Sequence, residues 1–467
     1  MWSLKNRHHI FLHIFHSYKY LLKNPPIIKL LRFNQEEEGL MDNPNIILTL
    51  LGIPNEKVAF YDAYESSDGN SRLYLELVDE RPSCPKCGSN ESTIHGYYEV
   101  TINNSIIRAH HTLVEIRMRR YKCKKCGKTF KETYSFYMPY RKISRATEIA
   151  IIEDLKECVS YAYIGRQYDL SRNTIINIFD SLPRQPREKL TQVICVDEFH
   201  FSNSKNKNCQ FPFVISSPYD ARILDIIEAR RWEYLRSYFV NVSPNERNEV
   251  KYFVSDMNET YRKLKKAFFP NATHIIDHFH VAKLFTNAIQ KVRTTIMKRE
   301  EYKSKEYLFL KKNWKMFLMN RHDLRKCRKV NKNTGEVTDF ELLVDQTLRQ
   351  YQELNEVYQA REEFYKYSLK LHYWMESKNN LEFFIKKFKG SFLKELNEIA
   401  STLENWFDEI VNSYAKTYIG FCLSNAVAEA NNNTIQTLID VGYGYGNFDR
   451  LRNRVLYINR NKKTNPE

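Results

Sequence analysis

The stretch Val193-Ile-Cys-Val-Asp197-Glu198-Phe199 decides how this chain is expected to fold. Four apolar residues followed by an aspartate are typical of a buried strand that ends in a carboxylate. Tyr252-Phe-Val-Ser-Asp256 repeats the pattern 59 residues later. Because a sheet presents side chains to a cleft at the ends of its strands, the two runs predict an α/β layer with acids at one edge.

Other short apolar runs complete the predicted sheet. Three β-type runs come first, and helix and strand then alternate, which is an order suited to an α/β layer architecture. The runs expected as strands are residues 193–197, 211–215, 223–227, 250–254 and 274–277, and helical patterns cover residues 232–242 and 258–268.

The composition limits the size and the surroundings of the protein. The chain has 467 residues, too many for one compact domain, and 42% of them are hydrophobic, enough for a real core. A formal net charge of +16 favours a polyanionic partner, and DNA, RNA and an acidic membrane surface all satisfy it. The sequence has no long uncharged apolar run and no signal-peptide cleavage site after its N-terminal apolar run. We therefore expect a cytoplasmic protein with no membrane partner.

Four of the nine cysteines form two CxxC pairs, Cys84/Cys87 and Cys123/Cys126, each followed by glycine. Each pair places two thiolates on one tight turn, and the glycine lets the backbone fold around a metal. Two such turns predict a closed, structural zinc site with four thiolate ligands, and the 35 residues between the pairs predict an inserted hairpin. A redox pair is one alternative. Histidine ligands from the spacer are another: His95, His110 or His111.

A basic run without any acid surrounds the second cysteine pair. Because its charges are fixed to a folded metal site, the run predicts contact with phosphate groups, and an ordinary solvated face is the alternative. The expected DNA-contacting residues are Arg117, Arg119, Arg120, Lys122, Lys124, Lys125 and Lys128.

Residues 144–182 carry the pattern of a helix-turn-helix, with Ser144 and Ser171 as candidate N-caps. In the last helix Ile175, Ile176 and Phe179 are expected to face inward, which leaves the polar face for a DNA groove. Any three-helix bundle can imitate this pattern, so plain packing is the alternative. The residues expected to face the groove are Arg172, Asn173 and Asn177.

Asp197 and Asp256 are the candidates for metal-dependent chemistry. A carboxylate at the end of an apolar run is costly to bury without a partner. Two such acids, with a third carboxylate from a helix, would make an all-oxygen site suited to Mg²⁺ or Mn²⁺ and to phosphodiester chemistry. Strand-end aspartates also cap helices, however, and Asp277 and Glu198 are rival ligands.

The motifs of this chain, in their order, resemble those of the ISL-three family of insertion-sequence transposases over roughly residues 41–460. No single motif is decisive, but the ordered set is highly specific. The matching pieces are Met41-Asp through Leu-Leu-Gly-Ile-Pro54, the CPxCGS and CxxCGKTF knuckles, Val196-Asp-Glu-Phe199, Ser255-Asp-Met257, Asp277-His-Phe-His-Val-Ala-Lys283, Ser424-Asn-Ala-Val-Ala-Glu429-Ala-Asn-Asn432-Asn-Thr-Ile435 and Gly442-Tyr-Gly-Tyr-Gly-Asn-Phe448.

The resemblance implies a multidomain α/β protein whose RNase H-like mixed sheet carries a DDE triad of Asp197, Asp256 and Glu429. It also implies an all-α insertion before the last acid, which accounts for the uneven spacing of 59 and then 173 residues. Asp277 becomes a neighbour of the triad rather than a ligand.

Four more residues are expected close to the triad. Asn425 and Asn432 flank Glu429 on one helix face and are expected to orient it or to contact DNA. His280 and Lys283 lie one helical turn apart, within reach of one phosphate, although an ordinary surface pair is the alternative.

The segments that follow from the motifs divide the whole chain. The first forty residues differ from the rest, so Met41 is the candidate natural start, and a genuine amphipathic arm is the alternative. The segments are residues 1–40 as an atypical extension, 41–80 as an N-terminal α/β segment, 81–135 as a zinc ribbon, 141–185 as a helix-turn-helix domain, 190–285 as the first part of the catalytic core, 286–415 as a helical insertion and 416–460 as the last acidic helix with a basic C-terminal helix.

The expected activity is nicking at the ends of a mobile DNA element, followed by attack of the freed 3′-OH on target DNA. Two Mg²⁺ or Mn²⁺ ions per active site and one structural Zn²⁺ are the expected cofactors. The expected partners are the element's terminal repeats, target DNA and at least one further copy of the chain, in a nucleoid-associated setting. The rivals are a non-catalytic DNA-binding regulator derived from a transposase and a structure-selective nuclease with an RNase H-like fold.

Overall fold

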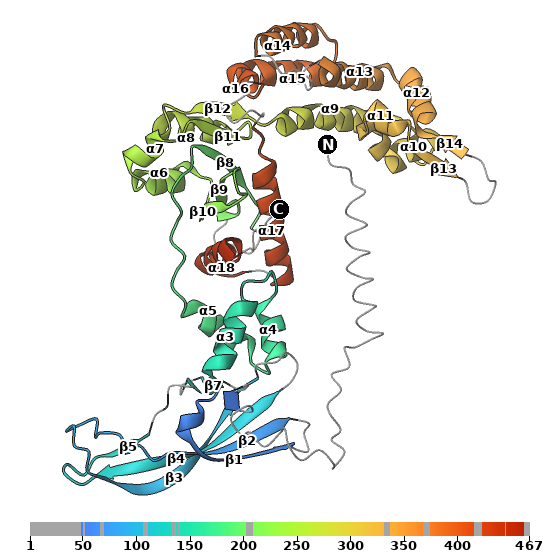
Figure 1. Ribbon diagram of the computed structural model, residues 1–467. Helices are drawn as coiled ribbons and strands as arrows, with labels where there is room; N and C mark the ends of the chain where they lie inside the picture. Colours follow the sequence, from blue (N-terminus) through green and yellow to red (C-terminus); the bar gives the residue numbers. More distant parts are fainter. Residues whose placement is uncertain are drawn as a thin grey trace. The chain divides into compact units, whose positions relative to one another are not determined.

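A computed structural model (Figure 1) describes most of the chain and divides it into two compact units, residues 1–149 and 150–467. The expected extension, residues 1–40, lies outside the described part, as do residues 41–47, which open the next expected segment. The described residues are 48–49, 52–65, 70–105, 111–132, 134, 137–138, 141–201, 209–330, 337–367, 374–414, 423–443 and 445–461. No helix among them is long and apolar enough to cross a membrane.

The first unit is built on a seven-stranded sheet. Its strands are β1 (Val58–Glu65), β2 (Ser71–Leu77), β3 (Ser92–Asn103), β4 (Thr112–Cys123), β5 (Thr129–Lys131), β6 (Tyr137–Met138) and β7 (Ile143–Ser144), after a short 3-10 helix, η1 (Asn55–Lys57). The order is β1-β2-β4-β3-β7-β6, with β5 beside β4. β3 and β4 form the hairpin that was expected between the cysteine pairs. Since β2 runs parallel to β4, residues before and after position 80 share one sheet.

Three helices occupy the region expected to be a helix-turn-helix: α3 (Arg145–Asp154), α4 (Tyr161–Gln167) and α5 (Arg172–Asp180). Ser144 Oγ accepts a hydrogen bond from the backbone N–H of Thr147 (3.0 Å), and Ser171 Oγ accepts one from Thr174 (3.1 Å). Both predicted N-caps are therefore confirmed.

The second unit contains α4 and α5, which meet at a tight turn. A Cβ on Gly165 would come within 2.5 Å of a carbonyl oxygen of that turn, so the close approach requires glycine. On α5 the buried residues are Ile175, Ile178 and Phe179. The prediction that Ile176 faces inward is wrong, because Ile178 lies one turn after Ile175 and takes that place on the buried face.

The second unit also holds the mixed sheet that positions the candidate site. Its strands are β8 (Val193–Glu198), β9 (Phe213–Ser216), β10 (Ile223–Ile227), β11 (Tyr252–Ser255) and β12 (Thr273–Ile276), in the order β10-β9-β8-β11-β12. β8, β11 and β12 are parallel, whereas β9 is antiparallel to both of its neighbours. The carboxyl ends of β8, β11 and β12 therefore meet at one edge of the sheet.

Helices α6 (Trp232–Val240), α7 (Pro244–Asn248) and α8 (Glu259–Phe268) connect these strands, and α6 and α8 confirm the two predicted helical patterns. Phe239 of α6 and Tyr261 of α8 pack with Phe213 and Phe253 of the sheet, and all four side chains are fully buried. Burial of large aromatic side chains contributes roughly 25 cal/mol per Å² of apolar surface, so this layer fixes the sheet from one side.

In its described residues, the segment expected as a helical insertion is mostly helical, with one short hairpin. The expected boundary between residues 285 and 286 falls inside α9 (His278–Arg299). The elements that follow α9 are α10 (Lys305–Lys312), η3 (Trp314–Leu318), α11 (Arg321–Leu324), β13 (Arg328–Val330), β14 (Val337–Asp339), α12 (Phe340–Gln350), α13 (Gln352–Tyr367), α14 (Trp374–Lys389), α15 (Lys394–Asn405) and α16 (Phe407–Asn412). β13 and β14 are antiparallel, so the expectation of an all-α insertion is wrong at this point. A continuous apolar core joins α9 to α13, α14 and α15.

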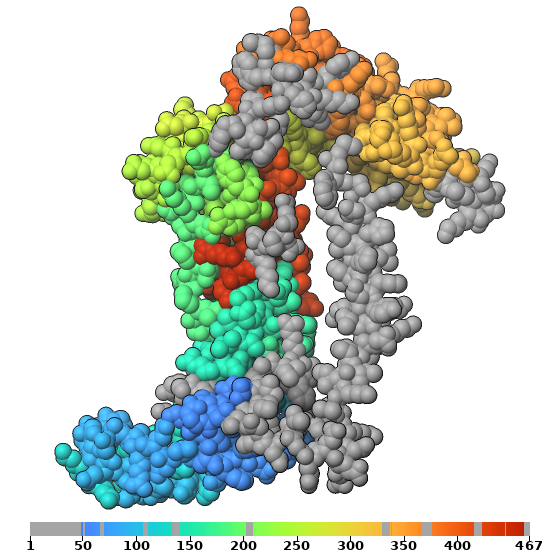
Figure 2. Space-filling view, in the orientation of Figure 1, coloured from blue at the N-terminus to red at the C-terminus, as the bar shows by residue number. Residues whose placement is uncertain are grey.

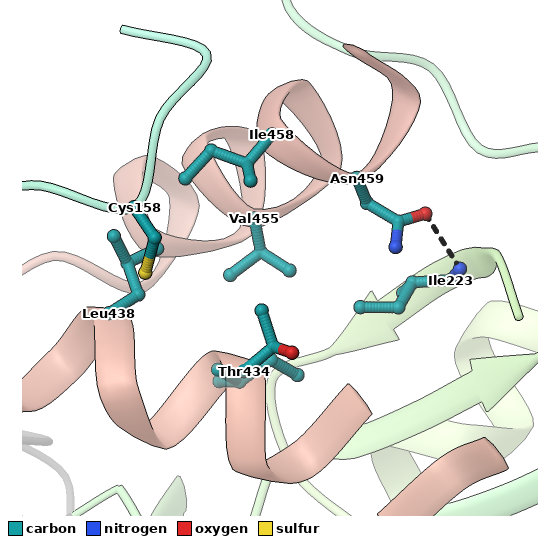
Figure 3. A pocket seen from close by; sticks show the side chains of 8 residues that line it. Cys158, Ile223, Thr434, Leu438, Val455, Ile458 and Asn459 are labelled. Carbon is teal, nitrogen blue, oxygen red and sulfur yellow. Dashed lines mark hydrogen bonds between the residues drawn. The ribbon is translucent and has the colours of Figure 1, made fainter. Parts of the chain in front are cut away.

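Two helices close the chain, α17 (Ala426–Val441) and α18 (Phe448–Asn461). The backbone N–H of Ile223 in β10 donates to Asn459 Oδ1 of α18 (2.9 Å; Figure 3). The cavity between α17, α18 and β10 has a volume of about 10 Å³ and is lined mainly by apolar side chains, among them Leu438 and Val455. Since this volume is at the limit for a single water molecule, the seam is closely packed and is no ligand site.

The fully buried Arg454 of α18 joins the C-terminal helix to the α4–α5 region. Its guanidinium donates to the carbonyl oxygens of Leu155 and Glu157 and lies over the rings of Tyr161 (5.4 Å) and Phe179 (5.5 Å). Carbonyl groups and aromatic faces together offset the loss of hydration of this charge.

Candidate active site and zinc centre

Asp197 and Asp256 lie at the same edge of the mixed sheet. Asp197 is the second-to-last residue of β8, and Asp256 directly follows the last residue of β11. The two strands are parallel neighbours in which Cys195 lies opposite Val254. The structure therefore places both acids on adjacent strand ends, as the sequence pattern predicts.

Helix α17 carries Glu429 to this edge and is attached to the sheet by two buried asparagines. Asn425 Nδ2 donates to the carbonyl oxygen of Val196 in β8 (3.3 Å), and Asn431 Nδ2 donates to Ser216 Oγ in β9 (3.0 Å). These two hydrogen bonds from side-chain amides fix both the position and the rotation of the helix. Sequence reasoning missed Asn431, although it shares a face with the apolar Ile435 four residues later.

Asn432 touches Asp197 directly. Its Nδ2 donates to Asp197 Oδ2 (2.9 Å) and to the carbonyl oxygen of Glu198 (3.1 Å). The backbone N–H of Glu198 donates to Asp197 Oδ1 (2.9 Å). Both oxygens of Asp197 are thus oriented, one of them by the helix that carries the third acid.

Asp277 caps two helices with one buried carboxylate. Its Oδ1 accepts from the backbone N–H of Phe279 at the start of α9 (3.2 Å), and its Oδ2 accepts from that of Asn425 at the start of α17 (3.0 Å). Both oxygens therefore serve as helix caps, which gives this strand-end acid a structural role at the starts of α9 and α17. An aspartate directly before a helical pattern was the sequence signal for this role.

Glu198, the other rival ligand, is engaged as well. It forms an ion pair with Arg230 and accepts a hydrogen bond from Tyr261 Oη. The Arg230 guanidinium also lies over the ring of Phe211, 4.8 Å from its centroid. Glu198 therefore holds the side chains of Arg230 and Tyr261 together beside Asp197.

The three acids resist ionisation because they are buried together. Burial raises the pKa of Asp197 to about 7, and the charges of Glu198 and Glu429 add to the shift. Burial raises the pKa of Asp256 to about 7 as well, with further contributions from Glu198 and Asp197. Burial also raises the pKa of Glu429.

Lys283 and His280 extend from α9 towards this cluster. The positive charge of Lys283 opposes the pKa shifts of Asp197, Asp256 and Glu429. Burial lowers the pKa of His280, so its imidazole is neutral near pH 7. Its buried Nε2 has no hydrogen-bond partner among the described residues, which leaves this nitrogen available to a ligand.

The acids fit divalent cations, but not one ion shared by all three. In the described part of the chain, only the four cysteines form a group of three or more ligands whose atoms all lie within 4.8 Å of one another. Ligands of a single Mg²⁺ at about 2.1 Å lie at most about 4.2 Å apart. Asp256 Oδ1 is buried without a hydrogen-bond partner, a state that a hard cation would relieve.

The two CxxC pairs form one four-cysteine centre. Cys84 Sγ lies 3.6 Å from Cys126 Sγ, and Cys87 Sγ lies 3.6 Å from Cys123 Sγ. A tetrahedral zinc ion with bonds of about 2.3 Å requires sulfur separations of about 3.8 Å. Four thiols at this spacing fit structural Zn²⁺ without a histidine ligand; His110 lies outside the described residues.

The two metal-binding turns have the same backbone conformation. Gly88 (φ +68°) and Gly127 (φ +72°) are both left-handed, and their N–H groups donate to Cys84 O (2.8 Å) and Cys123 O (3.0 Å). The backbone N–H of Cys126 lowers the pKa of Cys123, which favours the thiolate that a metal needs. The glycine after each pair was the sequence signal for this turn.

The basic run around the second pair is only partly free for DNA. Arg119 points inward, donates to Leu77 O (2.6 Å) and pairs with Glu132 (3.5 Å), so its expected phosphate contact does not fit the structure. Arg117 is exposed but pairs with Glu76 (2.9 Å). The other expected residues are exposed: Arg120, Lys122, Lys124, Lys125 and Lys128.

The polar face of α5 is exposed, as expected. Arg172, Asn173 and Asn177 all lie on it, opposite the buried Ile175 and Ile178.

Comparison with known proteins agrees with this arrangement. A family described as "Transposase" matches residues 194–455, a range that includes all three acids, and one described as "zinc-finger of transposase IS204/IS1001/IS1096/IS1165" matches residues 80–126. The chain is also 22% identical over 383 residues to the "Transposase for insertion sequence element IS1001" of Bordetella parapertussis, a match that covers 80% of this chain and 87% of that protein. The first match alone spans more than half of the chain, so the protein belongs to the ISL-three family of insertion-sequence transposases.

Proposed function

We propose that this protein is a DNA transposase whose DDE triad is Asp197, Asp256 and Glu429 on an RNase H-like sheet. The observation that carries the proposal is the position of Asp197. It lies on the strand next to the one that ends before Asp256, and it accepts a hydrogen bond from Asn432 of α17, the helix that carries Glu429. An acid placed in this way between the two others would be suited to bridge two cations, each of which would have one further acid as a ligand.

Two Mg²⁺ or Mn²⁺ ions would be held by Asp197, Asp256 and Glu429, with Asp197 as the ligand that both ions could share. When bound, such ions activate the attacking oxygen and stabilise the leaving oxygen of a phosphodiester. Raised carboxyl pKa values fit the same role, because a cation replaces the protons that the buried acids otherwise retain.

The residues around the triad hold it in place. Asn432 and the backbone of Glu198 orient the Asp197 carboxylate, and Asp277 anchors the start of the helix that carries Glu429. Lys283 would pair with the phosphate at the cleavage point. The neutral imidazole of His280 can donate or accept a hydrogen bond there.

The reaction that this site suits has two steps. Water attacks a phosphodiester at the element end and releases a 3′-OH, and that 3′-OH then attacks a phosphodiester of target DNA. Each step is an in-line displacement without a covalent bond between protein and DNA. Pairing of two element ends calls for at least two copies of the chain.

DNA recognition is proposed for two exposed surfaces. One is the polar face of α5, used as the recognition helix of a helix-turn-helix. The other is the basic surface beside the four-cysteine centre, where lysines and Arg120 are exposed. These residues supply affinity and register, whereas the triad supplies chemistry.

The deciding experiment compares the wild-type protein with Asp256→Ala on a duplex that carries the ends of its own element, in Mg²⁺ and in Ca²⁺. We expect nicking by the wild type in Mg²⁺ only, and no nicking but undiminished end binding by the variant. Wild-type protein that binds ends and never nicks them would identify a regulator. Nicking without transfer of a labelled 3′ end would identify a nuclease.

A further inference from the structure

The helical insertion contains a strongly basic stretch that plays no part in the site described above. From Lys298 to Lys329 it has twelve lysines and arginines and only four acidic residues. In the whole chain the two classes number 72 and 56, so the excess is concentrated here. The stretch covers α10, η3 and α11, in the gold part of the surface in Figure 2.

Exposed lysines in this stretch lie over aromatic rings. Lys303 Nζ is 5.4 Å from the ring centroid of Tyr302, and Lys311 Nζ is 5.5 Å from that of Tyr307. The two tyrosine rings are themselves in edge-to-face contact at 5.3 Å, so the four residues form one continuous cluster. Tyr302 is 69% exposed, which is unusual for a large aromatic side chain unless it has a partner.

The same pairing recurs one turn further along the chain. Lys315 Nζ lies 5.6 Å from the ring centroid of Trp314, whose side chain is 39% exposed. Among the described residues, Lys303, Lys311 and Lys315 have no carboxylate ion-pair partner. No carboxylate in the described part of the chain therefore balances these three charges.

Three exposed lysines elsewhere on the same insertion have carboxylate partners. Lys387 pairs with Glu363, Lys389 pairs with Glu404, and Lys394 pairs with Glu398. A mixed, self-paired surface of this kind is what solubility requires. The two sets of lysines differ although the helices that carry them share one apolar core. The difference indicates that the surface around α10 has a role other than solubility.

We infer that the α10 surface, defined as Tyr302, Lys303, Tyr307, Lys311, Trp314 and Lys315, binds the sugar-phosphate backbone of DNA. Unpaired lysines at the edges of aromatic rings bind phosphates, and the rings contact sugars or unstacked bases. The inference rests on the proposed function for the identity of the polyanion. It adds a DNA contact within the helical insertion, separate from α5, the zinc centre and the triad.

An acidic membrane surface is the competing polyanion, and the contacts of the apolar residues favour DNA. Membrane-surface helices bury a broad apolar face of Leu, Phe and Trp, whereas the apolar residues Leu310 and Phe317 here are already buried in the insertion core. Each exposed ring has a lysine beside it. That pattern suits a ribose-phosphate chain better than a lipid interface.

The test compares Lys303→Gln/Lys311→Gln/Lys315→Gln with the matched control Lys387→Gln/Lys389→Gln/Lys394→Gln in the full-length, zinc-loaded protein. Each variant loses three exposed lysines of the same insertion. The affinity for a duplex of arbitrary sequence is measured against salt concentration, without Mg²⁺, so that cleavage is not needed. Each lost phosphate contact lowers the slope of log K against log salt by about 0.9.

We expect the first variant to lose about two to three units of slope and at least about tenfold in affinity at low salt, and the control to lose less than one unit. Equal slopes for the two variants would overturn the inference. Lysine acetylation read by mass spectrometry gives a second result: DNA should protect Lys303 and Lys311. Protection by anionic phospholipid vesicles and not by DNA would assign the surface to membranes and overturn it too.

These outcomes are independent of the triad. If the wild-type protein never nicks DNA, the proposed chemistry fails while the slope difference still supports the α10 surface. If nicking occurs and the slopes are equal, the α10 surface fails alone.

Discussion

The side-chain amide of Asn432 donates to Asp197 Oδ2 over 2.9 Å and so joins the helix of the third acid to the strand of the first. The same amide donates to Glu198 O, and Asn425 and Asn431 attach the helix to Val196 and Ser216. Glu429 thus reaches the sheet edge through amide contacts made by its neighbours. The geometry of the site depends on these contacts as much as on the three acids.

Replacing Asn432 with alanine removes the bond that orients Asp197. We expect cleavage to fall roughly 10–100-fold, the usual cost of losing a residue that orients a metal ligand. The measurement is the rate of Mg²⁺-dependent nicking at saturating DNA. Asn433→Ala is the control, because Asn433 is the next residue on α17 and its side chain is exposed. Equal rates for the two variants would speak against the role of Asn432.

Asp277→Asn tests the double cap. An asparagine has only one acceptor oxygen, so one of the two N–H groups, from Phe279 or Asn425, loses its partner. We expect a loss of about 1–2 kcal/mol in the free energy of unfolding and a clear fall in cleavage, with DNA binding retained. The exposed Asp440→Asn on α17 is the control. Stability equal to that of the control would refute the cap.

The raised pKa values of Asp197 and Asp256 predict how stability depends on pH. Between about pH 4 and pH 7 the metal-free folded protein binds more protons at these groups than the unfolded chain does. Its stability therefore falls as pH rises through that window. Mg²⁺ competes with the protons, so the rise in Tm on adding Mg²⁺ should be small near pH 6 and large near pH 8.

The matched protein for this measurement is Asp197→Asn/Asp256→Asn, which lacks both titrating carboxyl groups. We expect its Tm to change little with Mg²⁺ at either pH. A rise in wild-type Tm that is as large near pH 6 as near pH 8 would contradict the assignment of the raised pKa values to the metal site.

Cys123→Ser tests the four-cysteine centre. Loss of one thiolate should reduce bound zinc from about one per chain to almost none, because a structural site needs all four ligands. Metal analysis gives the stoichiometry, and limited proteolysis should open the β3–β4 hairpin first. Cys327→Ser is the control, since Cys327 does not belong to the group of four cysteines. Zinc that stays bound in the Cys123 variant would exclude this centre.

Local patterns predicted much of the fold. The apolar runs predicted all five strands of the mixed sheet, and two strands start two residues later than expected, at Phe213 and Tyr252. The CxxC-Gly repeat predicted the cysteine turns, and the serine caps predicted where the first and last of the three short helices begin. Each of these features depends on residues a few positions apart, which is why the sequence alone contains them.

Contacts between distant residues were not predictable in the same way. Glu429 lies 173 residues after Asp256, and only the family resemblance connected them. The Arg119 side chain points inward because it pairs with Glu132 and donates to the carbonyl oxygen of Leu77, two residues that the sheet brings beside it. The double cap by Asp277 needs the start of a helix 148 residues away. Such pairings are set by tertiary packing, which local periodicity does not record.

Metal rescue tests the central claim most directly. Asp197→Cys, Asp256→Cys and Glu429→Cys are assayed for nicking of an element-end duplex in Mg²⁺ and in Mn²⁺, with the Asp→Ala and Glu→Ala proteins as controls. A thiolate is a poor ligand for Mg²⁺ and an acceptable one for softer metals. We predict that the cysteine variants are inactive in Mg²⁺ and regain nicking in Mn²⁺, whereas the alanine variants stay inactive in both. If any one of the three cysteine variants nicked DNA in Mg²⁺ at the rate of the wild-type protein, this result would contradict the proposed triad.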